Sequence, residues 1–442
     1  MTRLEKGPGT FSVDAASLAA FRVGFGLILC VGAIRFMAEG WIEPFFVEPS
    51  FFFKYDGFAW VHVLSRGGMY GLYSLIALFS AMIALGLFYR FAVVAFTLCF
   101  AYAQLIDVTN YLNHYYLVVL VGALLAFVPA HALWSLDAWR KPSLRRATVP
   151  ALALTALRFQ FAVVYFYAGL AKLTGDWLLH AEPLNVWFTA RDELPLIGAL
   201  IAKPAVAHAA SWAAFFYDST IVLWLSWRRT RPFAFVAVLC FHTLTHVFFD
   251  IGLFPFIMTL GATLFFSPSW PRRFVRGLSA QAVASERPQR LVIAAFAVYA
   301  LVQIAVPLRA FVHGGNVLWD EVGMRFSWRV MVREKNGSVA YQVKTRSRSF
   351  VVSPHDYLTW RQANEMSGQP DLVFQLAQHI GADLRARGFE DVEVRADARV
   401  SLNGRQPAPL LDPNADLLAL SDVAPAILPL APTPPIHLSS AR

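Results

Sequence analysis

A lysine stands at the end of a long apolar run, where its charge is costly. The stretch Arg158–Trp177 begins with about fourteen almost purely apolar residues and continues with Lys172, Asp176 and Trp177. A charged side chain at mid-bilayer costs about 2–3 kcal/mol on insertion scales, so membrane-embedded ionisable residues are candidates for function. Burial disfavours the ammonium form, and a dry lysine can therefore act as a proton acceptor. The alternative is a structural lysine that extends its charge to the lipid headgroups.

Two further polar groups stand at the ends of apolar runs. The first group, before the fourth run, is Asp107, Asn110, Tyr111, Asn113 and His114; the second, late in the seventh run, is His242, Thr245 and His246. His242 and His246 are four residues apart and share a helix face. As a zinc pair they lack a third ligand and the glutamate of HExxH. Hydrogen-bonded helix histidines are favoured over a metal pair, and we expect no metal.

The elements that position these residues are membrane helices. Of the 442 residues 57% are hydrophobic and 15% are charged, whereas soluble domains average about 45–50% and about 25%. Since a spanning helix needs about 20 apolar residues, nine runs are interpreted as spans. They are 15–37, 69–89, 91–107, 115–136, 151–173, 207–227, 232–249, 253–267 and 291–311. The third and eighth are short, and the seventh and eighth could instead form a re-entrant hairpin.

The net charge of +9 is explained by orientation rather than by a nucleic-acid partner. With nine spans, three basic loops fall on one side, which the positive-inside rule makes cytoplasmic. Their residues are Arg140, Lys141, Arg145 and Arg146; Arg228, Arg229 and Arg231; and Arg272, Arg273, Arg276, Arg287 and Arg290. The three polar groups and the C-terminal region then lie outside. The Ala- and Arg-rich composition suggests a bacterial inner membrane with a periplasmic domain; in a eukaryote that domain would be in the lumen of the endoplasmic reticulum.

The sequence divides into an α-helical transmembrane domain (1–311), an extracytoplasmic α+β domain (312–423) and a flexible Pro/Ala-rich tail (424–442). In the second domain, 339–352 is predicted to be a strand with a polar stretch at 345–349. The apolar stripe of 369–387 predicts an amphipathic helix with Gly388 as its C-cap. Residues 392–402 alternate like a strand and end at an Asn403–Gly404 turn.

Five blocks of the sequence resemble the vitamin K-dependent γ-glutamyl carboxylases. The blocks are YLNHYYL (111–117), YFYAGLAKLTGDWL (165–178), FHTLTHVFFDIGLFPF (241–256), RFSWRVMVREK (325–335) and SLNGRQPAPLLDP (401–413). They occur in the family's order and cover most of the chain. Tyr111 replaces the family's tryptophan and Lys335 its arginine. The last block lies near the end of the chain, whereas the animal enzymes continue, so their propeptide recognition is in doubt here.

The resemblance implies an enzyme that carboxylates glutamate in peptides or proteins. Lys172 matches the lysine whose free amine deprotonates vitamin K hydroquinone, either phylloquinone or menaquinone. Reaction with O2 gives a base that removes a γ-proton of glutamate, and the carbanion attacks CO2, coupled to quinone epoxidation. Asn113 and His114 match a pair beside the reacting groups, and His242 matches a second histidine.

The resemblance also implies binding sites for cofactor and substrate. The isoprenoid quinone is expected in an apolar slot open to membrane lipid, with contacts from Tyr111, Tyr167, Trp177, Thr245 and His246. Ser327 and Trp328 match part of the glutamyl-peptide site, and Arg333 or Lys335 can pair with the substrate carboxylate. On spacing alone, Trp328 is equally an interfacial anchor, and Arg333 and Lys335 belong to a solvated face.

Two other functions are open. A quinone-dependent oxidoreductase or epoxidase would use the same lysine without fixing CO2. A transporter is disfavoured, because the sequence shows no inverted repeat and its polar residues gather at one membrane face.

Overall fold

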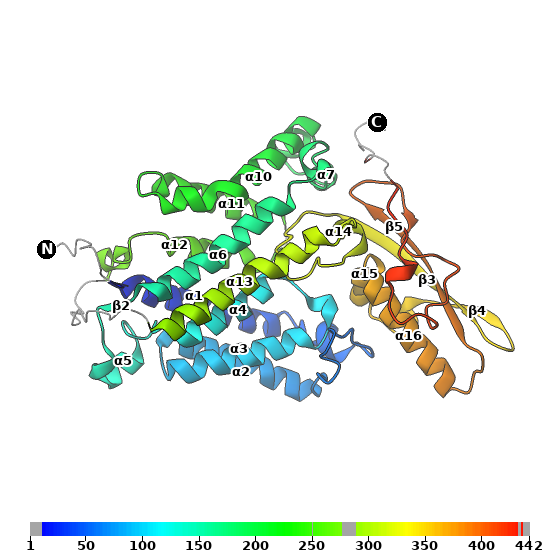
Figure 1. The fold of residues 1–442 in the computed structure, drawn as a ribbon, viewed down its shortest axis with the longest axis horizontal. Coiled ribbons are helices and arrows are strands. Elements are labelled where there is room, and N and C mark those ends of the chain that lie inside the picture. The colour runs from blue at the N-terminus through cyan, green and yellow to red at the C-terminus, as the bar shows by residue number, and fades with distance from the viewer. Residues whose placement is uncertain (1–10, 250, 276–288, 432–434, 436–442) are drawn as a thin grey trace.

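The computed structural model describes residues 11–249, 251–275, 289–431 and 435. A bundle of helices occupies one end of the molecule and a smaller α+β domain the other (Figure 1). The long helices of the bundle are α1 (Ala16–Ala38), α2 (Arg66–Leu85), α3 (Tyr89–Leu105), α4 (Asn113–Phe127), α6 (Ala151–Ala171), α10 (Pro204–Ser226), α11 (Arg231–Phe248), α12 (Phe254–Thr263) and α13 (Arg290–Val312). Short helices join them: α5 (Leu136–Arg140), α7 (Gly175–Leu178), α8 (Leu184–Thr189), α9 (Gly198–Ile201) and α14 (Val317–Asp320).

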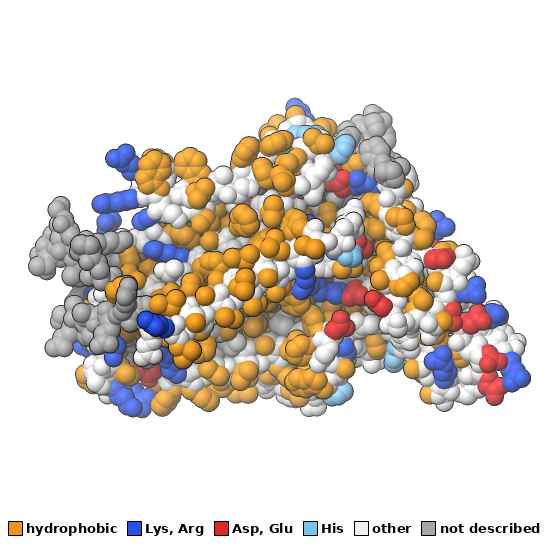
Figure 2. Space-filling model, in the orientation of Figure 1, with side chains coloured by type: hydrophobic (Ala, Val, Ile, Leu, Met, Phe, Trp, Pro, Cys, Tyr) orange, Lys and Arg blue, Asp and Glu red, His pale blue; other side chains and the backbone are white. Residues whose placement is uncertain are grey.

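Five of the described helices are long and apolar enough to cross a membrane: α1, α2, α6, α11 and α13. The shorter apolar helices α3, α4 and α12 have 10–17 residues, and α10, with 23 residues, is not among the five. Each of the nine predicted runs overlaps one of these nine helices. Hydrophobic side chains cover the middle of the bundle in Figure 2, and Lys and Arg gather at the end far from the α+β domain. The architecture is that of an integral membrane protein with five candidate spans.

Helices α6 and α10 approach each other closely at a glycine. A Cβ on Gly169 would lie 2.9 Å from the backbone nitrogen and 3.0 Å from the Cα of Ser219. Real Cβ atoms almost never lie within 3.0 Å of another heavy atom, so the two helices can come this close only with a glycine at position 169. Gly169 stands three residues before Lys172, at the C-cap of α6, and Ser219 directly follows Asp218 on α10. The glycine therefore brings these two ionisable side chains together.

The α+β domain is a four-stranded antiparallel sheet covered by two helices. The strand order is β4 (Ser349–Val352), β3 (Lys335–Lys344), β5 (Glu393–Leu402) and β6 (Ala408–Pro409). A separate small sheet pairs β1 (Ser12–Asp14) with β2 (Thr148–Pro150) in the bundle. Helices α15 (Trp360–Ser367) and α16 (Pro370–Ala386) lie between the sheet and the bundle (Figure 1). Gln362 on α15 donates to Asp107 at 2.7 Å, which ties the domain to the turn before α4.

The structure confirms three predicted elements of this domain and corrects one. The helix at 369–387, the strand at 392–402 and Gly388 (φ +87°) after the helix are observed. The single strand predicted at 339–352 is wrong, because it is the β3–β4 hairpin. The backbone nitrogen of Thr345 donates to the carbonyl of Arg348 at 2.9 Å and closes a turn at the polar stretch. Helix α15 was not predicted.

The first residues of the predicted flexible tail pack on the α+β domain. Ala426 is buried, and the nitrogen of Leu428 donates to the carbonyl of Leu410 at 2.9 Å. Residues 432–434 and 436–442 of this tail lie outside the described residues, as do Arg276 and Arg287 of the third basic loop.

Candidate active site

An apolar cavity of about 490 Å³ lies among α6, α10 and α11. We call it the membrane cavity. Its walls are Phe, Leu, Ala and Val side chains, with a small polar group that includes Lys172, Asp218, His242 and Tyr217. A mostly apolar cavity with a few convergent polar groups is the usual form of a small-molecule site.

Lys172 and Asp218 form a buried ion pair at this cavity. The ammonium nitrogen lies 2.7 Å from a carboxylate oxygen, and the two side chains are 5% and 8% exposed. The same nitrogen donates to the carbonyl of Ala168 at 3.2 Å and lies 5.1 Å from the ring of Trp177. A lysine that extended its charge to the headgroups would be exposed, so that alternative is wrong.

His242 lies in the same cavity and is positioned by two tyrosines. Its Nε2 is 3.2 Å from the hydroxyl of Tyr165 and 3.5 Å from that of Tyr217. Its Nδ1 is buried and has no hydrogen-bond partner among the described residues. Buried polar atoms are nearly always paired. An unpaired ring nitrogen at a cavity is therefore suited to a hydrogen bond with a bound molecule.

The structure places the predicted cofactor residues in different surroundings. Trp177 and Thr245 line the membrane cavity. Tyr167 instead donates to the carbonyl of Ile304 on α13 at 2.6 Å, and His246 is exposed, with its ring 5.1 Å from that of Phe256. Tyr111 lies at the junction with the α+β domain, where its hydroxyl accepts from the nitrogen of Phe326 at 2.7 Å.

Asn113 and His114 are adjacent in sequence but line different spaces. His114 is buried beside a cavity of about 40 Å³. The ring of Phe254 is near both histidines, with its centre 6.1 Å from that of His114 and 6.2 Å from that of His242. Asn113 points to the α+β domain, where its amide donates to the carbonyl of Arg329 at 3.3 Å.

A polar cavity of about 200 Å³, which we call the interface cavity, lies between the start of α4 and the α+β domain. The polar side chains that line it are Thr109, Tyr111, Asn113, Glu321, Arg325, Arg329, Arg333, Glu365 and Gln369. Met331 lines both this cavity and the membrane cavity. The segment around Met331 is therefore the wall between an apolar space and a polar one.

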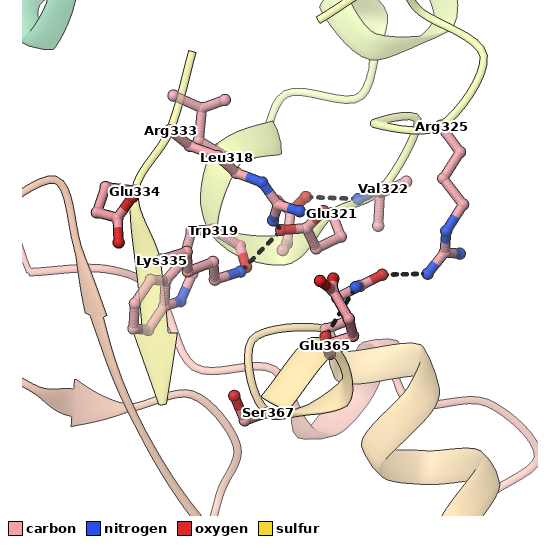
Figure 3. A network of polar contacts seen from close by, with 12 residues as sticks. Leu318, Trp319, Glu321, Val322, Arg325, Arg333, Glu334, Lys335, Glu365 and Ser367 are labelled. Carbon is pink, nitrogen blue, oxygen red and sulfur yellow. Dashed lines mark hydrogen bonds and ion pairs between the residues drawn. The ribbon is translucent and has the colours of Figure 1, made fainter. Parts of the chain in front are cut away.

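Arg333 and Lys335 are already paired within the chain. Both point to the buried carboxylate of Glu321 (Figure 3), with which Arg333 is in direct contact and Lys335 makes an ion pair at 3.0 Å. Lys335 also donates to the carbonyl of Trp319 at 2.5 Å. Burial lowers the pKa of Arg333 to about 10, and burial together with Arg333 lowers the pKa of Lys335 well below its usual value. The prediction of a solvated face is wrong for both side chains.

Ser327 and Trp328 are core residues. The Ser327 hydroxyl donates to the carbonyl of Met324 at 2.6 Å, and the Trp328 ring stacks on Tyr116 at 5.0 Å with no exposed surface. An interfacial anchor would be partly exposed, so that alternative is wrong for Trp328. Their segment has left-handed backbone angles at Phe326, Trp328 and Met331 (φ +64°, +58° and +53°). Such conformations cost of order 1–3 kcal/mol each and cluster at ligand sites.

The residues of these sites that were missed from the sequence include Asp218, Glu321 and Arg329. Asp218 had a readable signal, since it is a carboxylate inside a predicted span and the argument applied to Lys172 holds equally for it. Glu321 and Arg329 had none, because they stand in a polar segment where charged residues are usually solvated.

The fold and cavities define a class: a helical membrane protein with a small-molecule cavity below an α+β domain. Residues 11–270 match the HTTM domain family, and residues 288–426 match the lumenal domain of vitamin K-dependent gamma-carboxylase. The chain belongs to the vitamin K-dependent gamma-carboxylase family. None of the solved structures compared with the chain matches it.

Proposed function

We propose that this protein uses vitamin K hydroquinone, O2 and CO2 to convert peptide glutamate to γ-carboxyglutamate. The observation that carries the proposal is the buried Lys172–Asp218 pair at the polar end of an apolar cavity, in a chain with both domains of the carboxylase family. A base held away from water matches the first requirement of that reaction, the removal of a hydroxyl proton from the cofactor.

The membrane cavity fits an isoprenoid quinone. Its volume of about 490 Å³ is within the usual range for small-molecule sites, and its apolar walls suit a ring and its hydrocarbon tail. Lys172 and the unpaired Nδ1 of His242 could form hydrogen bonds with the oxygens of a bound quinone. When bound, the hydroquinone supplies with O2 the strong base that acts on glutamate.

The chain's own residues control the proton. As a free amine, Lys172 accepts a proton from a hydroxyl in the membrane cavity, and the Asp218 carboxylate at 2.7 Å stabilises the resulting ammonium. Tyr165 and Tyr217 hold the imidazole of His242 so that Nδ1 remains available. The apolar walls exclude water, which strengthens each of these interactions.

We further propose nine membrane crossings, with the divisions at 311 and 423 that the sequence suggests. The basic loops would be cytoplasmic and the α+β domain would lie outside, in the periplasm of a bacterium. The basic end of the bundle in Figure 2 and the description of the second domain as lumenal support this orientation. Labelling of single cysteines with a membrane-impermeant reagent tests it: a cysteine at Arg346 should react in intact cells, and one at Arg229 should not.

One observation favours the second candidate, a quinone-dependent oxidoreductase or epoxidase without carboxylation. Two cations expected to bind the substrate carboxylate, Arg333 and Lys335, are paired with Glu321. If the chain had no other receptor for a carboxylate, a peptide glutamate would have no partner.

Incorporation of labelled bicarbonate into a glutamate-containing peptide decides between the two. The assay contains the purified protein, vitamin K hydroquinone and O2, and quinone epoxide is measured in parallel. We expect incorporation and epoxide from the native protein, a loss of both by about 10²–10⁴-fold in Lys172→Ala, and no change in Lys344→Ala, which removes an exposed lysine of β3. Epoxide without incorporation would leave the second candidate, and normal turnover by Lys172→Ala would refute the role of the lysine.

A further inference from the structure

Arg329 is a buried arginine without a carboxylate partner among the described residues. It is 7% exposed, it lines the interface cavity, and its Nε has no hydrogen-bond partner. The guanidinium carbon lies 4.7 Å from the centre of the Phe311 ring. Burial alone lowers its pKa, to about 10, so the group remains a cation at neutral pH.

The two other arginines of this cavity are different. Arg325 pairs with Asp371 at 2.6 Å, and Arg333 contacts Glu321. Figure 3 shows Arg333 turned to Glu321, with Arg325 at a distance from this pair. Arg329 is therefore the arginine of the interface cavity whose charge the described part of the chain leaves uncompensated.

An uncompensated buried cation is unfavourable, and a protein retains it only where something offsets the cost. Removing a charge from water costs several kcal/mol even after relaxation. A bound anion would supply the missing partner, and an arginine is well suited to a carboxylate because its planar group donates two parallel hydrogen bonds. The left-handed backbone at Trp328 and Met331, on both sides of Arg329, indicates that its placement is imposed by the surrounding structure.

We propose that Arg329 is the receptor for the side-chain carboxylate of the peptide glutamate, held in the interface cavity. This inference rests on the proposed function. The γ-carbon is bonded directly to that carboxylate, so binding at Arg329 would bring it near Met331, the wall shared with the membrane cavity. A guanidinium on the carboxylate also stabilises the extra negative charge that develops when the neighbouring carbon loses a proton.

The acidic residues of this cavity are compatible with an anion. Glu321 is occupied by Arg333 and Lys335. Burial raises the pKa of Glu365, which favours its neutral acid form, a possible hydrogen-bond donor to a carboxylate. The amides of Asn113 and Gln369 at the same cavity offer further polar contacts.

Binding to the full-length protein in lipid nanodiscs tests the proposal without any turnover. The probes are a short peptide with one glutamate and the same peptide with glutamine in its place. We expect the native protein to bind the glutamate peptide at least tenfold more tightly, Arg329→Met to lose this preference, and Arg329→Lys to keep part of it. Arg348→Gln removes an exposed cation of the same domain and should retain the full preference.

Thermal unfolding separates a binding role from a structural one. Because the native cation lacks a carboxylate, Arg329→Met should unfold at the same or a higher temperature than the native protein. A lower midpoint in Arg329→Met, or a preference for glutamate that survives in it, overturns the proposal. So does a native protein that binds both peptides equally.

Two sets of results distinguish an error in the role of Arg329 from an error in the proposed carboxylase activity. If Arg329→Met binds and carboxylates the glutamate peptide normally, the carboxylase proposal stands and only the receptor is wrong. If the native protein prefers the glutamate peptide through Arg329 but incorporates no bicarbonate, the receptor stands and the carboxylase proposal fails.

Discussion

Two buried lysines in this molecule have the same kinds of partner and different charge balances. Lys172, in the bundle, contacts one carboxylate, one backbone carbonyl and the ring of Trp177. Lys335, in the α+β domain, also contacts one carboxylate, one carbonyl and a tryptophan ring, that of Trp319. However, Lys335 shares its carboxylate with Arg333, whereas Lys172 has Asp218 without such a competitor among the described residues.

If the proposed function is correct, this difference separates a reactive group from a structural one. At Lys172 one cation faces one anion beside a cavity of about 490 Å³, so a bound molecule can reach the pair. At Lys335 two cations compete for Glu321, although this lysine also lines a cavity, of about 200 Å³. Burial of a lysine beside a cavity is therefore not sufficient evidence for a base, and the charge balance around the lysine must be considered as well.

Removal of Asp218, the partner of Lys172, should have the largest effect on activity. In Asp218→Asn the ammonium of Lys172 loses its counter-ion, so bicarbonate incorporation should fall by about 10²–10⁴-fold, as for a lost acid–base group. Asp397→Asn, an exposed change on β5, is the control. The double variant Lys172→Met/Asp218→Leu should recover stability without recovering activity, because it leaves no unpaired buried charge. Full activity in Asp218→Asn would show that Lys172 does not need the Asp218 carboxylate for the reaction.

Removal of Glu321, the partner of Lys335 in the α+β domain, should reduce stability instead of activity. Glu321→Gln leaves Arg333 and Lys335 buried without a shared anion, and a broken buried pair costs about 3–5 kcal/mol. Denaturant unfolding of the purified protein measures this loss. Glu390→Gln, which breaks a surface pair with Arg346, should change little. An equal effect of both substitutions would show that the Glu321 cluster does not stabilise the fold.

The smallest expected effect is a change in the pH dependence of stability at Lys335. Its pKa is lowered in the folded state by burial and by Arg333, whereas an unfolded lysine keeps its proton to about pH 10.4. Between these two pKa values the unfolded chain binds more protons, so stability rises with pH, by about 1.4 kcal/mol per pH unit at most.

Unfolding midpoints measured across this pH range test the sign. Lys335→Met should remove the rise, and Lys344→Met, which changes an exposed lysine of β3, should retain it. If stability falls as pH increases in the native protein and not in Lys335→Met, the ammonium is stabilised in the folded state and the two lysines are alike.

The local elements were within reach of the sequence because short-range rules determine them. Apolar runs long enough for a membrane predicted where the bundle helices lie, the stripe at 369–387 predicted α16, and Gly388 predicted its end. The family blocks were recognised for the same reason, since each is a contiguous stretch. The β3–β4 hairpin was missed because its turn has polar residues but no glycine or proline signal.

Pairings between distant residues were decided only by the tertiary structure. The approach at Gly169 sets Lys172 beside Asp218, 46 residues apart, and no local rule ranks that contact above others. Likewise, Glu321 pairs with Arg333 and Lys335 but not with Arg329, although all four stand within fifteen residues. The sequence thus supplied the charged groups and their elements. Which charges remain uncompensated depends on distances and burial that exist only after the chain has folded.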